Sequence, residues 1–119
     1  NAIGAMPGGG HLYVRVRPLR RGDAHLARLT VGDTGTGIAK EIRPNLLTQF
    51  FTTKGSRGTG LGLWLTRDIV LRNRGRLRYR SSTKPPTGTT FALYLPATAQ
   101  LDIVRSHPRP DEKRTAIGA

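Results

Sequence analysis

Apolar and polar residues alternate near the start of the chain, as they do in strands that bury one face. Leu12, Val14 and Val16 alternate with tyrosine and arginine, which predicts a strand whose apolar side chains share one buried face. Apolar positions return over residues 26–31, after a polar stretch at residues 18–23. We therefore expect a hairpin of two strands joined by a turn over residues 18–23.

The same two-residue period reappears toward the end of the chain. Leu77 and Tyr79 alternate with arginines, and the apolar residues of segment 89–95 occupy every second position. Between these segments, the sequence Lys-Pro-Pro-Thr-Gly is typical of a turn. These patterns predict a second hairpin, whose last strand ends at Pro96.

A helical period separates the two predicted hairpins. Residues 60–73 place Leu61, Leu65 and Ile69 at intervals of four, so these side chains are expected to form the apolar face of a helix. Gly75 follows as the expected cap of that helix. The preceding residues 50–60 are rich in glycine and threonine and predict a mobile loop.

The remaining segments complete one domain. Residues 1–6 predict the last turns of a helix, and residues 39–47 predict a short helix that contains Pro44. Residues 98–119 lose the periodicity and carry prolines and mixed charges, which predicts a disordered tail. We expect a single domain over residues 1–97, with an α+β fold: a two-layer α/β sandwich of a mostly antiparallel sheet with helices on one face.

Charge and composition narrow the function classes. The 119 residues carry 20 basic and 7 acidic side chains, for a net charge of +13, which admits a polyanionic partner. The arginines are scattered and the few aromatic residues are not interleaved with them along the chain, so solvated faces are the preferred interpretation and no specific nucleic-acid partner is expected. The absence of cysteine excludes disulfides. With no apolar run near the roughly 20 residues of a membrane span and no signal peptide, a cytoplasmic domain is expected.

Three glycine motifs are the strongest candidates for chemistry. They are Asp-Thr-Gly-Thr-Gly-Ile at residues 33–38, Gly-Thr-Gly-Leu-Gly-Leu at 58–63 and Gly-Thr-Thr-Phe at 88–91. Each alone fits an ordinary turn, loop or strand start. The second precedes a predicted helix, whose free N–H groups and positive dipole end favour a phosphate. It is neither a P-loop, because no Gly-Lys-Ser/Thr follows, nor a dinucleotide fingerprint, because no strand directly precedes it.

Taken together, five motifs resemble those of a known family. The other two are Asn-Ala-x-x-Ala-Met-Pro-x-Gly-Gly at residues 1–10 and Phe-Phe-Thr-Thr-Lys at 50–54. In order and spacing, the five resemble the N box, first glycine box, F box, second glycine box and final Gly-Thr box of the ATP-binding catalytic domain of sensor histidine kinases. The wider superfamily includes gyrase, mismatch-repair and heat-shock chaperone ATPases. The resemblance implies an incomplete Bergerat-type ATP-binding fold, because the upstream strand and the start of the N-box helix are expected before Asn1.

The resemblance also implies roles for single residues. Asp33 corresponds to the carboxylate that accepts a hydrogen bond from the adenine amino group, beside the turn formed by Gly35 and Gly37. Thr89 corresponds to a threonine that helps to hold that carboxylate, although strand propensity explains this threonine equally well. Asn1 corresponds to the asparagine whose side-chain carbonyl ligates Mg²⁺. The residues expected at the phosphates are Lys54, Gly58, Thr59, Gly60, Leu61 and Gly62.

Departures from the family pattern affect the loop and the acceptor. Leu-Thr-Gln at residues 47–49 stands where Phe-Glu-Pro is usual, which alters how the lid packs, and Gly4 replaces a common acidic residue. His11, His25 and His107 lack the following acidic residue of the family's phospho-accepting histidine. No catalytic residue is therefore expected in this chain, and the acceptor belongs to another segment.

The resemblance finally implies a function and partners. The domain would bind Mg-ATP and, in a full-length homodimeric protein, transfer the γ-phosphoryl group to a histidine of its own dimerisation domain in two-component signalling. A response-regulator receiver domain is the expected partner, and the parent protein can be anchored in the inner membrane. The alternatives are an ATPase or serine kinase of the same superfamily, and a non-catalytic basic module that binds nucleotide or nucleic acid.

Overall fold

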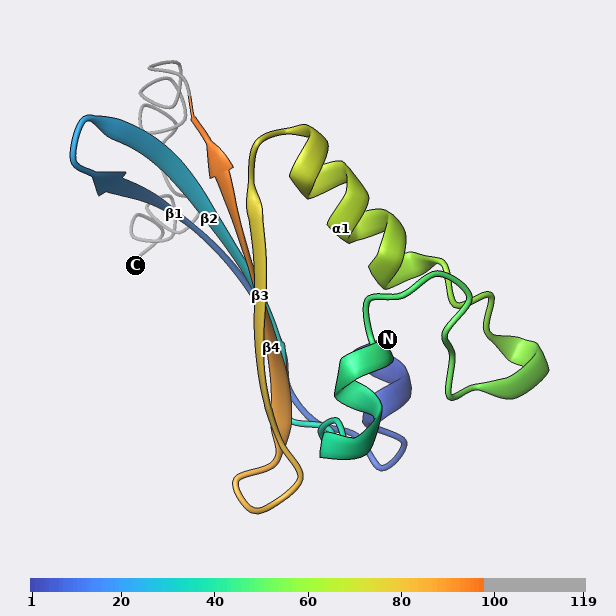
Figure 1. Cartoon of the computed structure of the whole chain (residues 1–119). Helices are drawn as coiled ribbons and strands as arrows, with labels where there is room; N and C mark the ends of the chain where they lie inside the picture. The colour runs from blue at the N-terminus through green and yellow to red at the C-terminus, as the bar shows by residue number, and fades with distance from the viewer. Residues whose placement is uncertain (98–119) are drawn as a thin grey trace, which may run out of the picture.

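Within residues 1–97, the part of the chain that the computed structural model describes, four strands form one sheet (Figure 1). The strands are β1 (Leu12–Arg21), β2 (Ala24–Asp33), β3 (Arg76–Ser82) and β4 (Gly88–Pro96). They lie in the order β1-β2-β4-β3, and each neighbouring pair is antiparallel. β2 and β4 therefore form the centre of the sheet, and β1 and β3 form its edges.

The helical elements of the same residues lie on one side of the sheet (Figure 1). The α-helix α1 contacts β3 and β4. The expected two-layer α+β architecture with helices on one face is confirmed, and the sheet is antiparallel throughout the described residues. The helical elements are the 3-10 helices η1 (Ile3–Ala5), η2 (Lys40–Asn45) and η3 (Gly55–Arg57) and the α-helix α1 (Gly62–Arg72).

The first hairpin has longer strands than its sequence predicts. The turn predicted over residues 18–23 is shorter in the structure. β1 continues to Arg21, and only Gly22 and Asp23 form the turn. Gly22 adopts a φ of 59°, which the left-handed region of a tight turn requires. Pro18 is tolerated inside β1 because an edge strand leaves one side without ladder hydrogen bonds.

The buried face predicted for β1 is also wrong. Every residue of β1 is exposed, and Val14 and Val16 keep 63% and 61% of their surface. The alternation is present, since Val14 lies opposite Val31 and Val16 opposite Leu29 on the side of the sheet that carries the helices. α1 covers β3 and β4 but does not extend over β1, so this part of the apolar face is uncovered.

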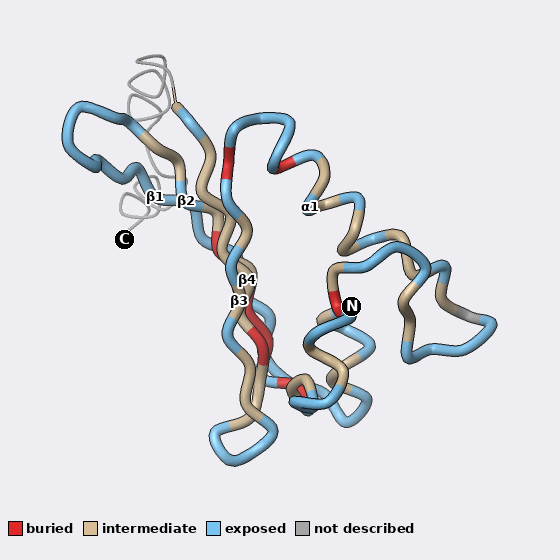
Figure 2. The backbone as a smooth tube through the Cα atoms, viewed as in Figure 1, coloured by how far each residue is buried: buried red, intermediate tan, exposed pale blue. Residues whose placement is uncertain are grey.

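α1 buries a different face from the one predicted. Val70 is 2% exposed, whereas Leu65 and Ile69 are 48% and 51% exposed. The prediction that Leu65 and Ile69 form the packed face is therefore wrong. The buried face is centred on Val70, the residue after Ile69. Ile69 lines an open groove of about 400 Å³ between α1 and β4, together with Leu93 and other residues. Figure 2 shows how few positions of the described chain are buried.

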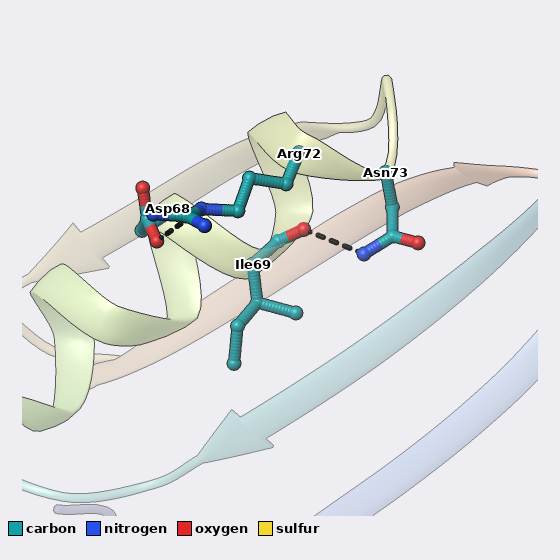
Figure 3. Close-up of polar contacts among 4 residues, drawn as sticks. All are labelled: Asp68, Ile69, Arg72 and Asn73. Atoms are coloured by element: carbon teal, nitrogen blue, oxygen red, sulfur yellow. Dashed lines mark hydrogen bonds and ion pairs between the residues drawn. The ribbon is translucent and has the colours of Figure 1, made fainter.

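The end of α1 is fixed by hydrogen bonds (Figure 3). The Asn73 side-chain amide donates to the carbonyl of Ile69 at 2.8 Å, and Arg72 pairs with Asp68 at 2.8 Å. The N–H of Gly75 donates to the carbonyl of Val70 at 2.8 Å, as in a Schellman motif.

The left-handed position of this motif is Arg74, with a φ of 55°, and not the predicted Gly75. Gly75 is constrained by space instead, because a Cβ there would lie 2.6 Å from the carbonyl oxygen of Tyr94 and 3.0 Å from Val70. A glycine is therefore needed where the turn after α1 passes close to β4.

Two predicted helices form shorter and tighter turns. The segment 39–47 forms only η2, whose Pro44 has no N–H for an α-helical hydrogen bond. Residues 1–6 contain only η1, in which the Ala5 N–H donates to the carbonyls of Asn1 and Ala2, both at 3.1 Å. The tail predicted over residues 98–119 lies outside the described residues.

We predict that Val70→Ala lowers the free energy of unfolding by about 1–2 kcal/mol, because it removes two methyl groups from the best-buried side chain on α1. Leu65→Ala is the matched control on the same helix and should cost less than about 1 kcal/mol, since half of that side chain is exposed. Urea unfolding followed by circular dichroism measures both. An equal loss in the two variants would contradict the packing described for α1.

Candidate nucleotide-binding site

Asp33 is the centre of the candidate site. It ends β2, and its side chain is almost fully buried on the side of the sheet that carries the helices. Its Oδ1 atom accepts hydrogen bonds from the N–H groups of Gly35, at 2.9 Å, and Thr89, at 3.2 Å. The Oδ2 atom makes no hydrogen bond within residues 1–97, and no fully buried side-chain oxygen there lacks a partner. Oδ2 therefore reaches solvent and is free to accept a hydrogen bond from a ligand.

Thr89 holds Asp33 through its main chain rather than through its side chain. Thr89 lies opposite Asp33 in the β2–β4 pairing and opposite Ser81 in the β3–β4 pairing. Its hydroxyl is 2.8 Å from the Ser81 hydroxyl. The row Asp33, Thr89 and Ser81 thus runs across three strands on one face of the sheet.

Ser81 is a site residue that the sequence analysis missed. Its hydroxyl accepts a hydrogen bond from the N–H of Ile38 at 2.7 Å and donates to the carbonyl of Gly88 at 3.1 Å. It thereby ties the first glycine box to the start of β4. The available signal was a small polar residue at an inward position of β3, but its meaning depends on the strand register, which the alternation pattern does not give.

Arg43 is a second residue that sequence reasoning missed. Its guanidinium group donates to the carbonyl of Ile38 at 3.0 and 3.1 Å and to the carbonyl of Ser81 at 2.8 Å. Planar donors of this kind can bridge two carbonyls at once. Arg43 therefore anchors η2 against both the first glycine box and β3.

The first glycine box is constrained sterically as well as by hydrogen bonds. Gly37 has a φ of 77°, and a Cβ there would overlap the main chain of Ser82. Gly35 is buried, and a Cβ there would come within 2.5 Å of the Ala5 carbonyl oxygen. That same carbonyl accepts a hydrogen bond from the N–H of Thr36 at 3.0 Å. The box therefore packs directly on the N-terminal segment.

Lys54 also lies beside the N-terminal segment. A Cβ at Gly4 would be 3.2 Å from the Lys54 ammonium nitrogen, so glycine at position 4 leaves room for this side chain. Asn1 belongs to the same segment and is exposed. Segment 1–5, the first glycine box and the loop that carries Lys54 are thus brought together, although they are far apart in sequence.

The second glycine box shapes the start of α1. Gly60 has a φ of 67°, and a Cβ there would overlap the main chain of Phe50, so the loop folds back on itself at this point. Gly58 packs against Thr52, and the Thr59 hydroxyl accepts a hydrogen bond from the N–H of Leu61 at 3.4 Å.

The helix itself begins at Gly62 without a side-chain cap. A Cβ at Gly62 would meet nothing within 4 Å. The first turn of α1 therefore has N–H groups that no side chain caps, and such groups can receive an anion. None of the predicted site residues lines the groove between α1 and β4, so that groove is separate from this chemistry.

The described residues contain no group of three or more histidine, cysteine, aspartate or glutamate side chains that could hold a metal ion. No helix among them has the length and apolarity needed to cross a membrane.

The comparison with known families decides the classification. Residues 1–99 match the model of the family described as "Histidine kinase-, DNA gyrase B-, and HSP90-like ATPase". The chain belongs to this family. The resemblance identified from the five motifs is thereby confirmed.

Curated relatives of this ATPase-family domain are named as kinases. The signal transduction histidine-protein kinase/phosphatase MprB of Mycobacterium ulcerans is 33% identical over 121 residues, covering 97% of this chain and 23% of the relative. Sporulation kinase A of Bacillus subtilis is 34% identical over 96 residues, covering 81% of this chain and 15% of the relative. The chain thus spans less than a quarter of each of these proteins.

Solved structures of histidine kinases have the same fold. A mycobacterial sensor histidine kinase MprB structure matches with a TM-score of 0.64 and 32% identity, covering 80% of this chain and 64% of that structure. A catalytic-domain structure of the histidine kinase ThkA matches with a TM-score of 0.63 and 27% identity, covering 80% and 58%. The expected fold class of the ATPase-family domain is therefore confirmed.

We predict that Ser81→Ala destabilises the domain by about 1–3 kcal/mol, because it leaves the Ile38 N–H and the Thr89 hydroxyl without their partner. Ser82→Ala, one residue along β3, should cost less than about 1 kcal/mol, since the half-buried Ser82 hydroxyl bonds only within its own turn, to Lys84. Chemical denaturation of both variants measures the difference. If Ser82→Ala proved the more harmful, the role of Ser81 would be refuted.

Proposed function

We propose that this domain binds ATP through Asp33, whose free carboxylate oxygen accepts a hydrogen bond from the adenine amino group. The observation that carries the proposal is that the two carboxylate oxygens of Asp33 have different surroundings. Oδ1 is held by two main-chain N–H groups, and Oδ2 is left toward solvent. A fixed anionic acceptor favours an amino group and repels the carbonyl that guanine presents at the same position.

Two regions support phosphate binding. The first is the second glycine box, where Gly58, Thr59, Gly60, Leu61 and Gly62 lead into a helix start without a side-chain cap. The second is Lys54, whose ammonium group lies beside residues 1–5 and adds positive charge. The loop between Phe50 and Gly60 would act as the lid over the phosphates.

Mg²⁺ fits this site as an ion held mainly by the nucleotide. The only metal-ligating role proposed for the chain is that of the Asn1 side-chain carbonyl, a hard oxygen donor on an exposed residue three positions before Gly4, which Lys54 approaches. Mg²⁺ commonly keeps several waters and binds one or two protein oxygens together with phosphate oxygens. Bound there, the ion would neutralise phosphate charge, and Asn1 would orient it.

In the longer protein, the domain would deliver the γ-phosphoryl group of ATP to a histidine. The relative MprB, which is named as a histidine-protein kinase, supports this proposal. Positioning and charge neutralisation account for most of the catalysis in phosphoryl transfer, so the domain needs no general base of its own. The acceptor histidine would belong to a dimerisation domain of the same homodimeric protein, and the phosphoryl group would pass to a response-regulator receiver domain.

We predict that Asp33→Asn weakens ATP binding by about 2–3 kcal/mol, or roughly 30- to 150-fold in Kd. The amide oxygen can retain the two main-chain donors, which turns the amide N–H₂ group toward the adenine amino group. The preference for ATP over GTP should narrow, because the guanine carbonyl can accept from that N–H₂ group. Fluorescent-nucleotide titration measures both, with Asp23→Asn in the exposed β1–β2 turn as the control. An Asp33→Asn affinity within twofold of wild type would remove Asp33 from adenine recognition.

A further prediction concerns the metal. Asn1→Ala should remove most of the gain in ATP affinity that Mg²⁺ provides, while affinity without Mg²⁺ stays within about twofold, because adenine recognition belongs to Asp33. Asn45→Ala, at the end of η2, is the control and should leave the Mg²⁺ effect unchanged. Calorimetric titration of ATP with and without Mg²⁺ provides the measurement. An undiminished Mg²⁺ effect in Asn1→Ala would show that Asn1 is not a ligand.

A further inference from the structure

The side of the sheet that faces away from the helices carries a concentration of arginines. Residues on a strand alternate between its two faces, and the strand pairings align the rows across the sheet. Asp33, Thr89 and Ser81 lie on the helix side, so their immediate neighbours on β2, β4 and β3 belong to the other side. That side, here called the arginine face, includes seven exposed arginines: Arg15, Arg17, Arg21, Arg28, Arg76, Arg78 and Arg80.

These positive charges are not neutralised within the described residues. The acidic residues of this part of the chain lie elsewhere: Asp33 on the helix side, Asp68 on α1, and the others in a turn and in η2. The ion pair formed there joins Arg72 to Asp68, outside the arginine face. Arg17 even lies directly opposite Arg28 in the β1–β2 register. Like charges placed opposite each other are unfavourable, and a bound anion would relieve that cost.

A tyrosine ring lies flat on the same face. A Cβ at Gly32 would overlap the ring of Tyr13, so this ring crosses β2 where glycine leaves space. The Tyr13 hydroxyl reaches the Thr90 hydroxyl on β4 at 2.8 Å, which fixes the ring in place. Tyr13 as a whole keeps 46% of its surface exposed. Tyr94 lies on the same face, between Arg28 and Arg76 in its row.

We propose that the arginine face binds single-stranded nucleic acid without sequence preference, which goes beyond the nucleotide site on the other side of the sheet. Proteins bind single strands by combining a basic surface that follows the phosphates with aromatic rings on which bases stack. Both elements are present here. The preference for solvated charge in the sequence analysis rested on aromatic residues not interleaved with arginines along the chain, whereas the sheet interleaves them across strands.

Other polyanions fit the face less well. An acidic polypeptide would match the charge but has no planar group for the Tyr13 ring. A DNA duplex hides the faces of its bases, and an anionic bilayer supplies phosphates without bases. The arginine face has no lysine, and guanidinium groups bind phosphate in a bidentate manner and also stack on planar rings. A single strand uses the arginines and the tyrosine together.

Fluorescence anisotropy with a single-stranded oligothymidylate of about twelve nucleotides tests the charge component on the full chain. The double variant Arg15→Gln/Arg78→Gln should weaken binding by tenfold or more and lower the magnitude of the log–log salt slope by about 1.4. The control Lys40→Gln/Arg67→Gln removes the same charge from exposed positions on η2 and α1 and should stay within twofold. Equal losses in both double variants would show non-specific attraction to the basic chain and would overturn the proposal.

Tyr13 variants test the stacking component. Tyr13→Phe keeps the ring and should bind within about threefold of wild type, whereas Tyr13→Leu covers Gly32 without a ring and should bind about tenfold more weakly. Equal affinities of the two variants would refute stacking on Tyr13. Inorganic polyphosphate, oligoglutamate of equal charge and anionic lipid vesicles serve as competitors. If any of them competes as well as the oligonucleotide at equal charge, the surface does not select a single strand.

Photo-crosslinking of an oligonucleotide that contains iododeoxyuridine needs no variant, so it remains decisive if a substitution unfolds the domain. The expected adduct is on Tyr13 or Tyr94. Adducts confined to residues outside the arginine face would overturn the proposal. Asp33→Asn should leave oligonucleotide affinity unchanged, so failure of the nucleotide proposal and failure of this one can be told apart.

Discussion

The two main-chain hydrogen bonds received by one oxygen of Asp33 are the constraint on which the rest of the site depends. They join the turn after β2 to the start of β4, 56 residues further along the chain. The Ser81 hydroxyl extends this connection to β3 and back to Ile38. A buried carboxylate needs such donors, because an unpaired charge in this position would be costly. The same donors engage Oδ1 and leave Oδ2 as the oxygen that faces solvent.

Few apolar side chains are buried in the described chain, and several of the buried residues are polar. The buried hydrophobic residues of the described chain are Leu46 and Val70, whereas Thr30, Asp33 and Thr89 are buried polar residues. α1 packs on β3 and β4 and leaves the apolar side of β1 open, together with the groove beside Ile69. The site therefore lies in the part of the sheet with the densest network of hydrogen bonds rather than over an apolar core.

The strands, their order along the chain and the one-sided placement of helices could be predicted from the sequence, because period-two alternation and glycine-rich turns are local signals. The burial of β1 and the buried face of α1 could not, since each depends on which surface another element covers. Pro44 lies within the helix predicted over residues 39–47, and the segment forms only the short 3-10 helix η2 because proline has no N–H group to donate. The motif resemblance located Asp33 and the glycine boxes, whereas Ser81 and Arg43 required the strand register and the path of the chain after β2.

The edge position of β1 also has a consequence for the dynamics of the domain. The N–H groups of Gly35 and Thr89 both donate to Asp33, where β2 pairs with β4. These amides should exchange with solvent only when the centre of the sheet unfolds. β1 is paired on one side and exposed along its whole length, and it pairs with Asp33 at Leu12. The part of β1 far from this pair can therefore separate from β2 more easily than the part beside Asp33. Hydrogen exchange would therefore show two units: a slow unit around the carboxylate and a fast unit that includes the far part of β1. The residues of the candidate site and the Tyr13 ring, which is tied to Thr90, would then stay in place while the far part of β1 opens and closes.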